Sequence, residues 1–420
     1  CLYYNTFYNA KEYYKKALES SPPSKQLLDR CIEKCEKIIR YHPKSDLVPH
    51  AIFLMGKCLF EKEEYEAAER KFIELTLYYP KSSFTPKAYI MLGRCYLKGG
   101  KFIDARDAFS KAESNRRIRE EASFNIVSTY IVSGEYAEAI EKGNEFIKKF
   151  PKSRFKGSVF ELMGVAYDSL GNFNDAINMY RRALKITTDK LSVSTKIGND
   201  LLALGEIEEA LSLFLALRKG SLTKEEDRDI ALKIADCHIA LNDYKAAVKI
   251  LEKYPNDQLA LYKLGIIYET YLSDLEKAKS YYDKARNRGP STPTGKEALL
   301  KSSAIGKLTQ YRDKLDEGEE SEAAKTQFLL AETYLLDFKK IDEAITEYQK
   351  VIENFPESEY APKAAYSIAW VLENVKKDDE KAILAYQSVI EKYPNTKYSE
   401  KAQKAIDRLK ATSSEHGSEQ

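Results

Sequence analysis

Apolar and polar residues recur along most of the chain with the spacing of an amphipathic α-helix. Helical segments of about 12 to 15 residues alternate with short turns that contain Gly-Glu, Gly-Lys, Gly-Asn or Asn-Asp. Prolines such as Pro43, Pro80 and Pro151 follow most of the second segments and end them. The pattern therefore predicts a succession of helix pairs.

The pairs also repeat in sequence. In the copy that begins at Gly56, small residues occupy positions 56 and 68, an aromatic ring follows at Phe72, and Pro80 closes the unit. Nine copies are in register, and their first small or apolar positions are Gly56, Gly93, Val127, Gly164, Gly198, Ala235, Gly265, Ala331 and Ala369. This is the signature of the tetratricopeptide repeat (TPR), in which small residues allow two helices to approach and stacked pairs bury a shared core.

The sequence thus predicts an all-α fold, a TPR α-solenoid coiled as a right-handed superhelix, with about ten helix pairs and a C-terminal capping helix. Residues 1–43 hold an atypical first pair, and residues 44–290 form an N-terminal superhelix. A long helix over 296–315 has no matching partner, so residues 291–322 are expected to separate that superhelix from a C-terminal segment. The C-terminal segment covers 323–411, including the capping helix, and a disordered tail is expected at 412–420.

Charge and motifs narrow the function. Lys and Arg number 67 and Asp and Glu 65, a net charge of +2, which disfavours a nucleic-acid binder. No apolar run approaches the ~20 residues of a membrane span. The chain has four histidines and lacks HExxH, CxxC, GxSxG and Gly-rich phosphate-loop motifs. We therefore expect no enzyme, no cofactor, no metal site and no small-molecule substrate.

The cysteines divide into two groups. Cys58, Cys95 and Cys237 each lie two residues after the first small position of a repeat, and Cys31 and Cys35 lie in the first pair. All five are expected to be small core residues, because free cysteine packs as an apolar side chain. Cys1 belongs to no repeat position.

Cys1 is the first residue, where a bacterial lipoprotein carries its acyl chains after signal-peptide cleavage. We therefore expect lipidation at Cys1, the alternative being that the numbering happens to begin there. Tyr3, Tyr4, Phe7 and Tyr8 follow directly. Such rings suit the headgroup layer of a membrane, or they cover the apolar end of the first pair.

The repeat junctions carry a further pattern. YHPKSDL, YYPKSSF, FPKSRF, FPESEY and YPNTKY share an aromatic-Pro-x-Ser/Thr-x-aromatic or Leu order. In these junctions the chain resembles outer-membrane TPR lipoproteins of the BamD type and their CpoB-like periplasmic relatives. The resemblance implies a protein-interaction scaffold on the periplasmic face of the bacterial outer membrane, in outer-membrane protein assembly. Alternatives are a structural arm of a secretion or envelope-spanning complex, such as type 9 secretion, or a soluble adaptor if Cys1 is not lipidated.

TPR geometry also indicates where a protein partner would bind. The first helix of each pair lines the concave groove, which selects His50, Phe53, Lys57, Phe60, Lys87, Ile90, Arg94 and Phe124. A solvated helix face is the alternative. At the C-terminal end Tyr366 and Trp370 occupy equivalent positions, as a second partner surface or as residues covered by the capping helix.

Overall fold

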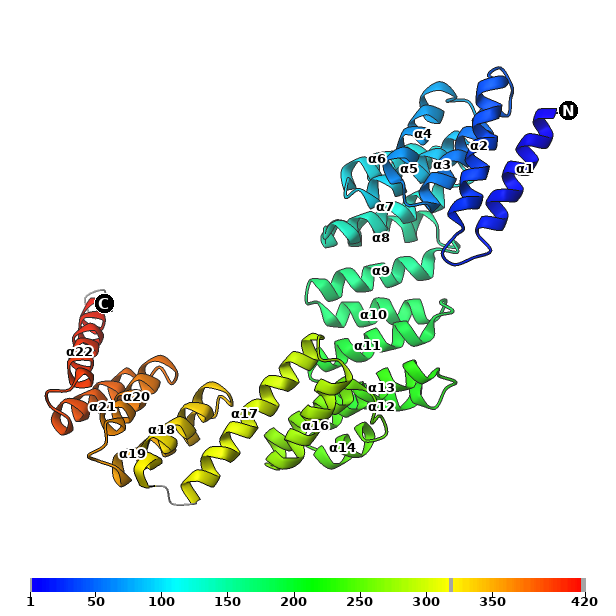
Figure 1. The fold of residues 1–420 in the computed structure, drawn as a ribbon. Coiled ribbons are helices and arrows are strands. Elements are labelled where there is room, and N and C mark those ends of the chain that lie inside the picture. The colour runs from blue at the N-terminus through cyan, green and yellow to red at the C-terminus, as the bar shows by residue number, and fades with distance from the viewer. Residues whose placement is uncertain (1, 317–319, 417–420) are drawn as a thin grey trace. The chain divides into compact units, whose positions relative to one another are not determined.

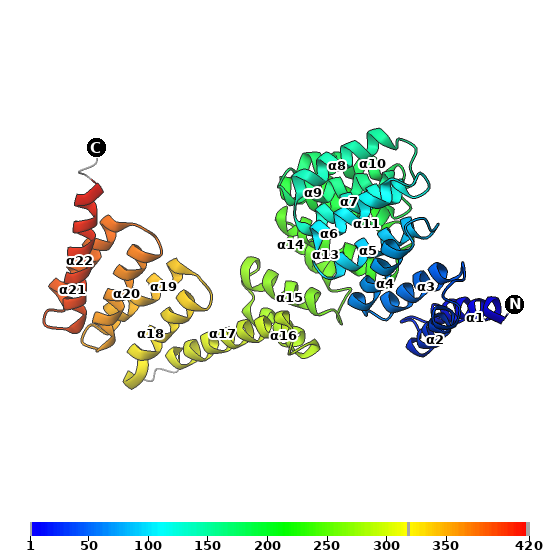
Figure 2. The same cartoon turned by 90° about the horizontal axis from the view of Figure 1, so that it is seen from above.

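The computed structural model describes residues 2–316 and 320–416, with side chains for 4–316 and 322–411. The described part is helical and contains no strand (Figure 1 and Figure 2). The helices are α1 (Leu2–Ala17), α2 (Lys25–Tyr41), α3 (Val48–Glu61), α4 (Tyr65–Tyr78), α5 (Thr85–Lys98), α6 (Phe102–Glu113), α7 (Arg119–Ser133), α8 (Tyr136–Lys149), α9 (Lys156–Ser169), α10 (Phe173–Leu184), α11 (Lys190–Leu204), α12 (Ile207–Arg218), α13 (Lys224–Ala240), α14 (Tyr244–Leu251), α15 (Gln258–Ile266), a π-helical turn η1 (Ile267–Tyr271), α16 (Leu275–Arg288), α17 (Pro293–Asp316), α18 (Glu320–Leu336), α19 (Ile341–Asn354), α20 (Tyr360–Asn374), α21 (Asp379–Lys392) and α22 (Lys397–His416).

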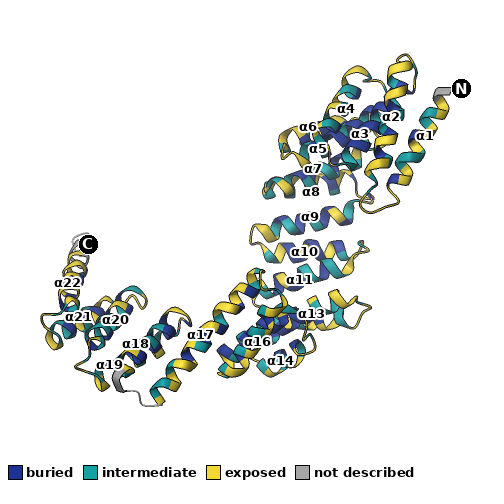
Figure 3. Ribbon diagram, in the orientation of Figure 1, coloured by how far each residue is buried: buried dark blue, intermediate teal, exposed yellow. Residues whose placement is uncertain are grey.

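The order of the helices confirms the predicted fold class. Ten pairs run from α1–α2 to α15–α16 and from α18–α19 to α20–α21, with α17 and α22 unpaired. In each pair we call the earlier helix the first helix and the later one the second helix. Along each ribbon, buried and exposed residues alternate, as expected for amphipathic helices stacked against neighbours (Figure 3).

The chain divides into two compact units, residues 1–233 and 234–420. The division differs from the expected break at 291–322. Here α17 packs against both α16 and α18, and one apolar core runs from Leu261 on α15 through Ile305 on α17 to Val371 on α20. The long helix therefore continues the stack, because Ala298, Ile305 and Leu308 supply it with a buried face of its own.

The small positions and the rings of the repeat pack directly on each other. A Cβ atom built on Gly56 would lie 2.7 Å from the Phe72 ring, and one on Gly164 would lie 2.5 Å from the Tyr180 ring. The alanines at the second small position are all fully buried: Ala68, Ala105, Ala139, Ala176, Ala210, Ala247, Ala278, Ala344 and Ala382. The ring thus lies on the glycine of its own pair, and the two helices are held at the distance that this contact sets.

The turn inside each repeat contains one residue with a positive φ. Glycine takes this position at Gly100, Gly134, Gly171 and Gly205, and other residues take it at Glu63, Asn242, Ser273, Lys339 and Lys377. The three repeats that carry an inserted residue reach this position one residue later, at Ser273, Lys339 and Lys377. In the first of them η1 takes up the insertion at the end of α15.

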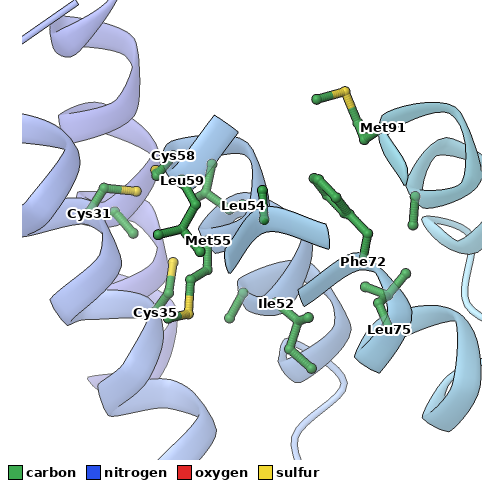
Figure 4. Packing of buried hydrophobic residues seen from close by; sticks show 14 of the residues in the cluster. Cys31, Cys35, Ile52, Leu54, Met55, Cys58, Leu59, Phe72, Leu75 and Met91 are labelled. Atoms are coloured by element: carbon green, nitrogen blue, oxygen red, sulfur yellow. The ribbon is translucent and has the colours of Figure 1, made fainter. Parts of the chain in front are cut away.

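The five described cysteines are buried, which confirms their prediction as core residues. Cys31 and Cys35 on α2 and Cys58 on α3 lie close together against Met55 and Leu59 (Figure 4).

The capping helix is longer than expected. It ends at His416 rather than at 411, so five residues assigned to a disordered tail are helical. Residues 417–420 lie outside the described part of the chain.

Candidate protein-interaction site

The order of residues that recurs at the repeat junctions has a local structural cause. The hydroxyl oxygens of Ser45, Ser82 and Ser153 each accept a hydrogen bond, 3.2 Å long, from the backbone N–H two residues further on. The acceptor fixes the chain just before the next first helix begins. The residue so placed is Leu47, Phe84 or Phe155, at the N-cap of α3, α5 or α9.

Where the junction residue is aromatic, it forms a ring pair with the preceding first helix. Phe84 meets Phe53 of α3 at 5.1 Å between ring centroids, and Phe155 stacks on Phe124 of α7 at 4.9 Å. In the second unit Tyr360 pairs with Phe328 and Tyr398 pairs with Tyr366, at 5.6 and 5.9 Å. Each pair joins consecutive repeats through rings that lie three residues before the first small position.

Cations lie over these ring pairs. Lys87 is 5.9 Å from the Phe84 ring, Arg154 is 4.7 Å from the Phe155 ring, and Lys363 is 4.0 Å from the Phe328 ring. A cation above an aromatic face contributes about 0.5–1 kcal/mol at an exposed site. The first helices thus carry a repeated aromatic–cation unit on both sides of the division.

Several such groups lie on α3 and α5 or at the junction between them, and we call His50, Lys57, Phe84, Lys87 and Arg94 the α3–α5 surface. His50 lies 4.5 Å from the Phe84 ring and 5.9 Å from the Phe7 ring of α1, measured between centroids. Its Nδ1 is 3.0 Å from the Asp46 carbonyl oxygen. The rings of three successive repeats are therefore in contact.

Positive charge on the α3–α5 surface is only partly neutralised. Lys57 is half-buried, 4.4 Å from the Tyr14 ring, and burial lowers its pKa; Glu61 opposes this shift, and Lys87 and Arg94 add to it. Arg94 forms a 2.9 Å ion pair with Glu121 of α7. Three cations thus act on one region that holds one direct ion pair, so a further carboxylate would be stabilised there.

The structure separates the residues predicted for the groove. Lys87 is exposed, and Arg94, His50, Phe53, Lys57 and Phe124 are half-exposed. Ile90 is 4 % exposed and packs with Phe109 and Ala105, so its assignment to the groove surface is wrong. Phe60 meets Tyr65 of its own second helix at 5.2 Å, so it contributes to the pair rather than to the strip of rings.

At the C-terminal end the two predicted residues differ. Tyr366 is packed between Tyr386 and Tyr398, and α22 therefore covers it. Trp370 stays 43 % exposed, so the expectation that the capping helix would cover it is wrong.

On α1, Tyr4 and Tyr8 are exposed, whereas Phe7 packs against the core. Cys1 and the side chain of Tyr3 lie outside the described residues.

Sequence reasoning missed a set of buried carboxylates. Glu269 and Glu373 accept hydrogen bonds from the hydroxyls of Tyr282 (2.5 Å) and Tyr386 (2.8 Å), 13 residues further on. Lys301 pairs with Glu269 at 2.8 Å, and Arg408 pairs with Glu373. The sequence did carry a signal for these contacts. Glu269 and Glu373 each lie four residues after the first small position of a repeat, and the second helix of that repeat holds a tyrosine.

Other kinds of site find no support among the residues with described side chains. That part holds no cluster of three or more His, Cys, Asp and Glu side chains suited to a metal ion. None of the described helices combines the length and apolar character needed to cross a bilayer.

Comparison with known families agrees with the repeat architecture. Three models, each described as tetratricopeptide repeat, match residues 53–117, 90–154 and 195–260, residues 259–292, 325–358 and 363–396, and residues 159–194. Together they cover well over half of the chain. The chain belongs to the tetratricopeptide repeat family.

Relatives match over parts of their length only. The chain is 32 % identical over 92 residues to human protein O-mannosyl-transferase TMTC2, covering 22 % of this chain and 11 % of that protein. It is 26 % identical over 157 residues to a tetratricopeptide repeat protein 21 homolog from Caenorhabditis briggsae, covering 33 % and 12 %. The chain thus matches only about a tenth of the length of these curated relatives.

Two solved structures align over nearly their whole length but at low sequence identity. A tetratricopeptide repeat protein from Parabacteroides merdae aligns with 70 % of this chain and 99 % of its own, at 12 % identity and a TM-score of 0.42. The C-terminal part of a TPR protein from Cytophaga hutchinsonii aligns with 71 % and 99 %, at 15 % identity and a TM-score of 0.41. The family assignment rests on the repeat models and not on these matches.

Proposed function

We propose that this chain is a non-catalytic scaffold that binds an extended segment of a partner protein on the α3–α5 surface. The observation that carries the proposal is the cluster of Lys57, Lys87 and Arg94 beside the joined rings of His50 and Phe84. TPR proteins commonly bind protein partners, and an aromatic–cation surface selects segments that combine carboxylates with apolar or aromatic side chains.

Binding would proceed through two kinds of contact. A carboxylate of the segment would pair with Lys87 or Arg94 and reduce the repulsion that acts on Lys57. Exposed pairs of this kind contribute about 0.2–1 kcal/mol each, so the rings of Phe84 and His50 would supply the apolar part of the affinity. The proposed recognition is therefore moderate in strength and sensitive to salt.

We propose further that the scaffold works at the periplasmic face of the bacterial outer membrane, in outer-membrane protein assembly. The repeat junctions that resemble the BamD-type lipoproteins support this location. The α1 helix would face the headgroups, because Tyr4 and Tyr8 are 57 % and 59 % exposed and Lys11 lies 5.9 Å from the Tyr8 ring. The intact mass of the protein from its native membrane tests lipidation of Cys1: acyl chains support the location, and an unmodified cysteine refutes the lipid anchor.

Photo-crosslinking tests the interaction surface. A photoreactive residue at position 87 should yield partner peptides rich in acidic and apolar residues. The same residue at position 148, which is an exposed lysine on the second helix α8, serves as the matched control. Crosslinks from position 148 but not from 87 would refute groove binding and favour a structural arm.

A further inference from the structure

The second helix α14 is shorter than every other second helix of the ten pairs. It has eight residues, whereas the others have 12 to 17. Pro255 ends it early, and Asp257 then caps α15 by accepting a 2.8 Å hydrogen bond from the N–H of Ala260. At 1.5 Å per residue, at least about 6 Å of helix is missing from the stack.

A cavity of about 580 Å³ lies where this turn is missing. Its lining comes from the chain after α14, from α15 and from α16: Glu252, Pro255, Asn256, Leu261, Leu264, Tyr281, Lys284, Asn287 and Arg288. Leu261 and Leu264 of α15 are buried and belong to its apolar side, together with Pro255. The volume is large enough for several side chains.

We call the cavity beside α14 the α14 furrow, and a comparable cavity between α6, α7 and α8 shows what α14 lacks. That cavity measures about 420 Å³ and lies between two second helices of full length, α6 and α8. Glu113 at the end of α6 lies 3.7 Å from Lys149 of α8, so opposite charges meet across it. In the α14 furrow the helix that would bring such a carboxylate is replaced by a turn.

The cations of α16 consequently lack a carboxylate partner. Among the residues with described side chains, neither Lys284 nor Arg288 has a carboxylate oxygen within 4 Å. Lys284 lies 4.8 Å from the Tyr281 ring, and Arg288 donates to the Asn256 side chain. Glu252 accepts a 3.2 Å hydrogen bond from the Tyr281 hydroxyl. The open side of the furrow is therefore basic and has an apolar interior.

We propose that this furrow is a second docking site, which takes an acidic amphipathic helical segment of a partner protein in the place of the missing turn of α14. Apolar side chains of the segment pack against Pro255 and the Tyr281 ring, and its carboxylates pair with Lys284 and Arg288. The site lies within the second unit and its residues differ from those of the α3–α5 surface, so the two can fail independently.

A peptide from the chain itself provides a defined probe. Residues 341–354, IDEAITEYQKVIEN, form α19, an acidic second helix that packs against the following first helix α20 in the way that α14 does only partly against α15. The labelled peptide, held helical by a side-chain lactam, is titrated with the full chain by fluorescence anisotropy. A second peptide carries lysine at its acidic positions.

We expect saturable binding of the acidic peptide, at least tenfold weaker binding to Lys284→Glu/Arg288→Glu, and a preference of that variant for the basic peptide. Lys277→Glu/Lys279→Glu makes the same charge change elsewhere on α16 and should leave binding to the furrow unchanged. Circular dichroism confirms that each variant is folded. The proposal is overturned if the acidic peptide shows no saturable binding, or if it binds the wild type and Lys284→Glu/Arg288→Glu equally. Dimerisation of the wild type that this double variant abolishes would place a second copy of the chain in the furrow, and also overturns it.

Discussion

Asp200 is a buried carboxylate without the tyrosine and cation partners that Glu269 and Glu373 have. It occupies the position that Cys58, Cys95 and Cys237 fill in other repeats, two residues after the first small position. It is 3 % exposed, and its Oδ2 has no hydrogen-bond partner, nor has the Tyr180 hydroxyl. Burial, with a smaller effect from Asp168, raises the pKa of Asp200 to about 7. The ionised form is therefore disfavoured in the folded chain.

The pKa of Asp200 in the folded chain is raised from its ordinary value of 3.8, so the unfolded chain releases this proton at lower pH than the folded chain does. The free energy of unfolding therefore falls as pH rises from about 4 to about 7. We expect Asp200→Asn to remove this loss and to stabilise the first unit at pH 8 by on the order of 2–4 kcal/mol. Urea unfolding at pH 5 and pH 8 measures it.

The control for this change is Asp175→Asn on α10, which replaces an exposed carboxylate. It should leave the pH dependence as it is in the wild type. An Asp200→Asn variant with the wild-type pH dependence would contradict the assignment of a protonated buried carboxyl.

Glycines under the rings give the second prediction. In Gly164→Ala the added Cβ would overlap the Tyr180 ring, and we expect a loss of about 1–3 kcal/mol in the free energy of unfolding. In Gly306→Ala, on α17, the nearest atom to the Cβ is the Lys279 side chain at 3.8 Å, so helix propensity should raise stability by about 0.5–1 kcal/mol. Thermal unfolding of both variants checks the opposite signs. A neutral Gly164→Ala would show that the contact is loose.

Some of this residue-scale structure was predictable and some was not. The spacing of Gly164 and Tyr180 in the repeat was enough to place them in one packed pair. The covering of Phe53 by Phe84 was not predicted, because the repeat was considered one unit at a time and this contact joins two. Ile90 was misplaced for another reason, because its buried neighbours Ala105 and Phe109 lie on α6, the second helix of its own pair.

At the scale of the element, the turn between the helices of a repeat controls their geometry. Lys377 has a φ of 56°, and Gly171 has a φ of 75° at the equivalent point. A side chain in this region costs roughly 1 kcal/mol relative to glycine. The non-glycine turns therefore hold strain that the packing of the pair outweighs.

Lys377→Gly should raise the denaturation midpoint, by about 0.5–1 kcal/mol in the free energy of unfolding, because it relieves the left-handed backbone. Gly171→Ala should lower it by a similar amount, although no atom lies within 4 Å of its Cβ. Equal midpoints for both variants and the wild type would contradict the backbone explanation.

Element existence was predictable because the small residues, rings and prolines recur at fixed spacing. The role of α17 was not, because the repeat pattern marks a helix only by its match to the other copies. A helix that breaks the pattern can still bury a face, as Ala298 and Ile305 show. The division near residue 233 has no signal in composition or turn residues.

At the scale of the whole molecule, interaction surfaces arise from groups that several repeats bring together. The α3–α5 surface combines Phe84 from a junction with Lys57 and Arg94 from two first helices. The α14 furrow arises from what one repeat omits. The basic and aromatic positions of the sequence indicated the α3–α5 surface. The α14 furrow could not be predicted from the sequence, because it depends on the cavity beside the short helix.

The central claim is that the α3–α5 surface binds an acidic segment. The most direct measurement is a calorimetric titration of the segment recovered by crosslinking from position 87, with the wild type and with Lys87→Glu/Arg94→Glu. Lys111→Glu/Lys148→Glu on the second helices is the charge-matched control. We expect the first double variant to bind at least tenfold more weakly, the control to bind normally, and wild-type affinity to fall with salt. Equal dissociation constants for all three proteins would contradict the account.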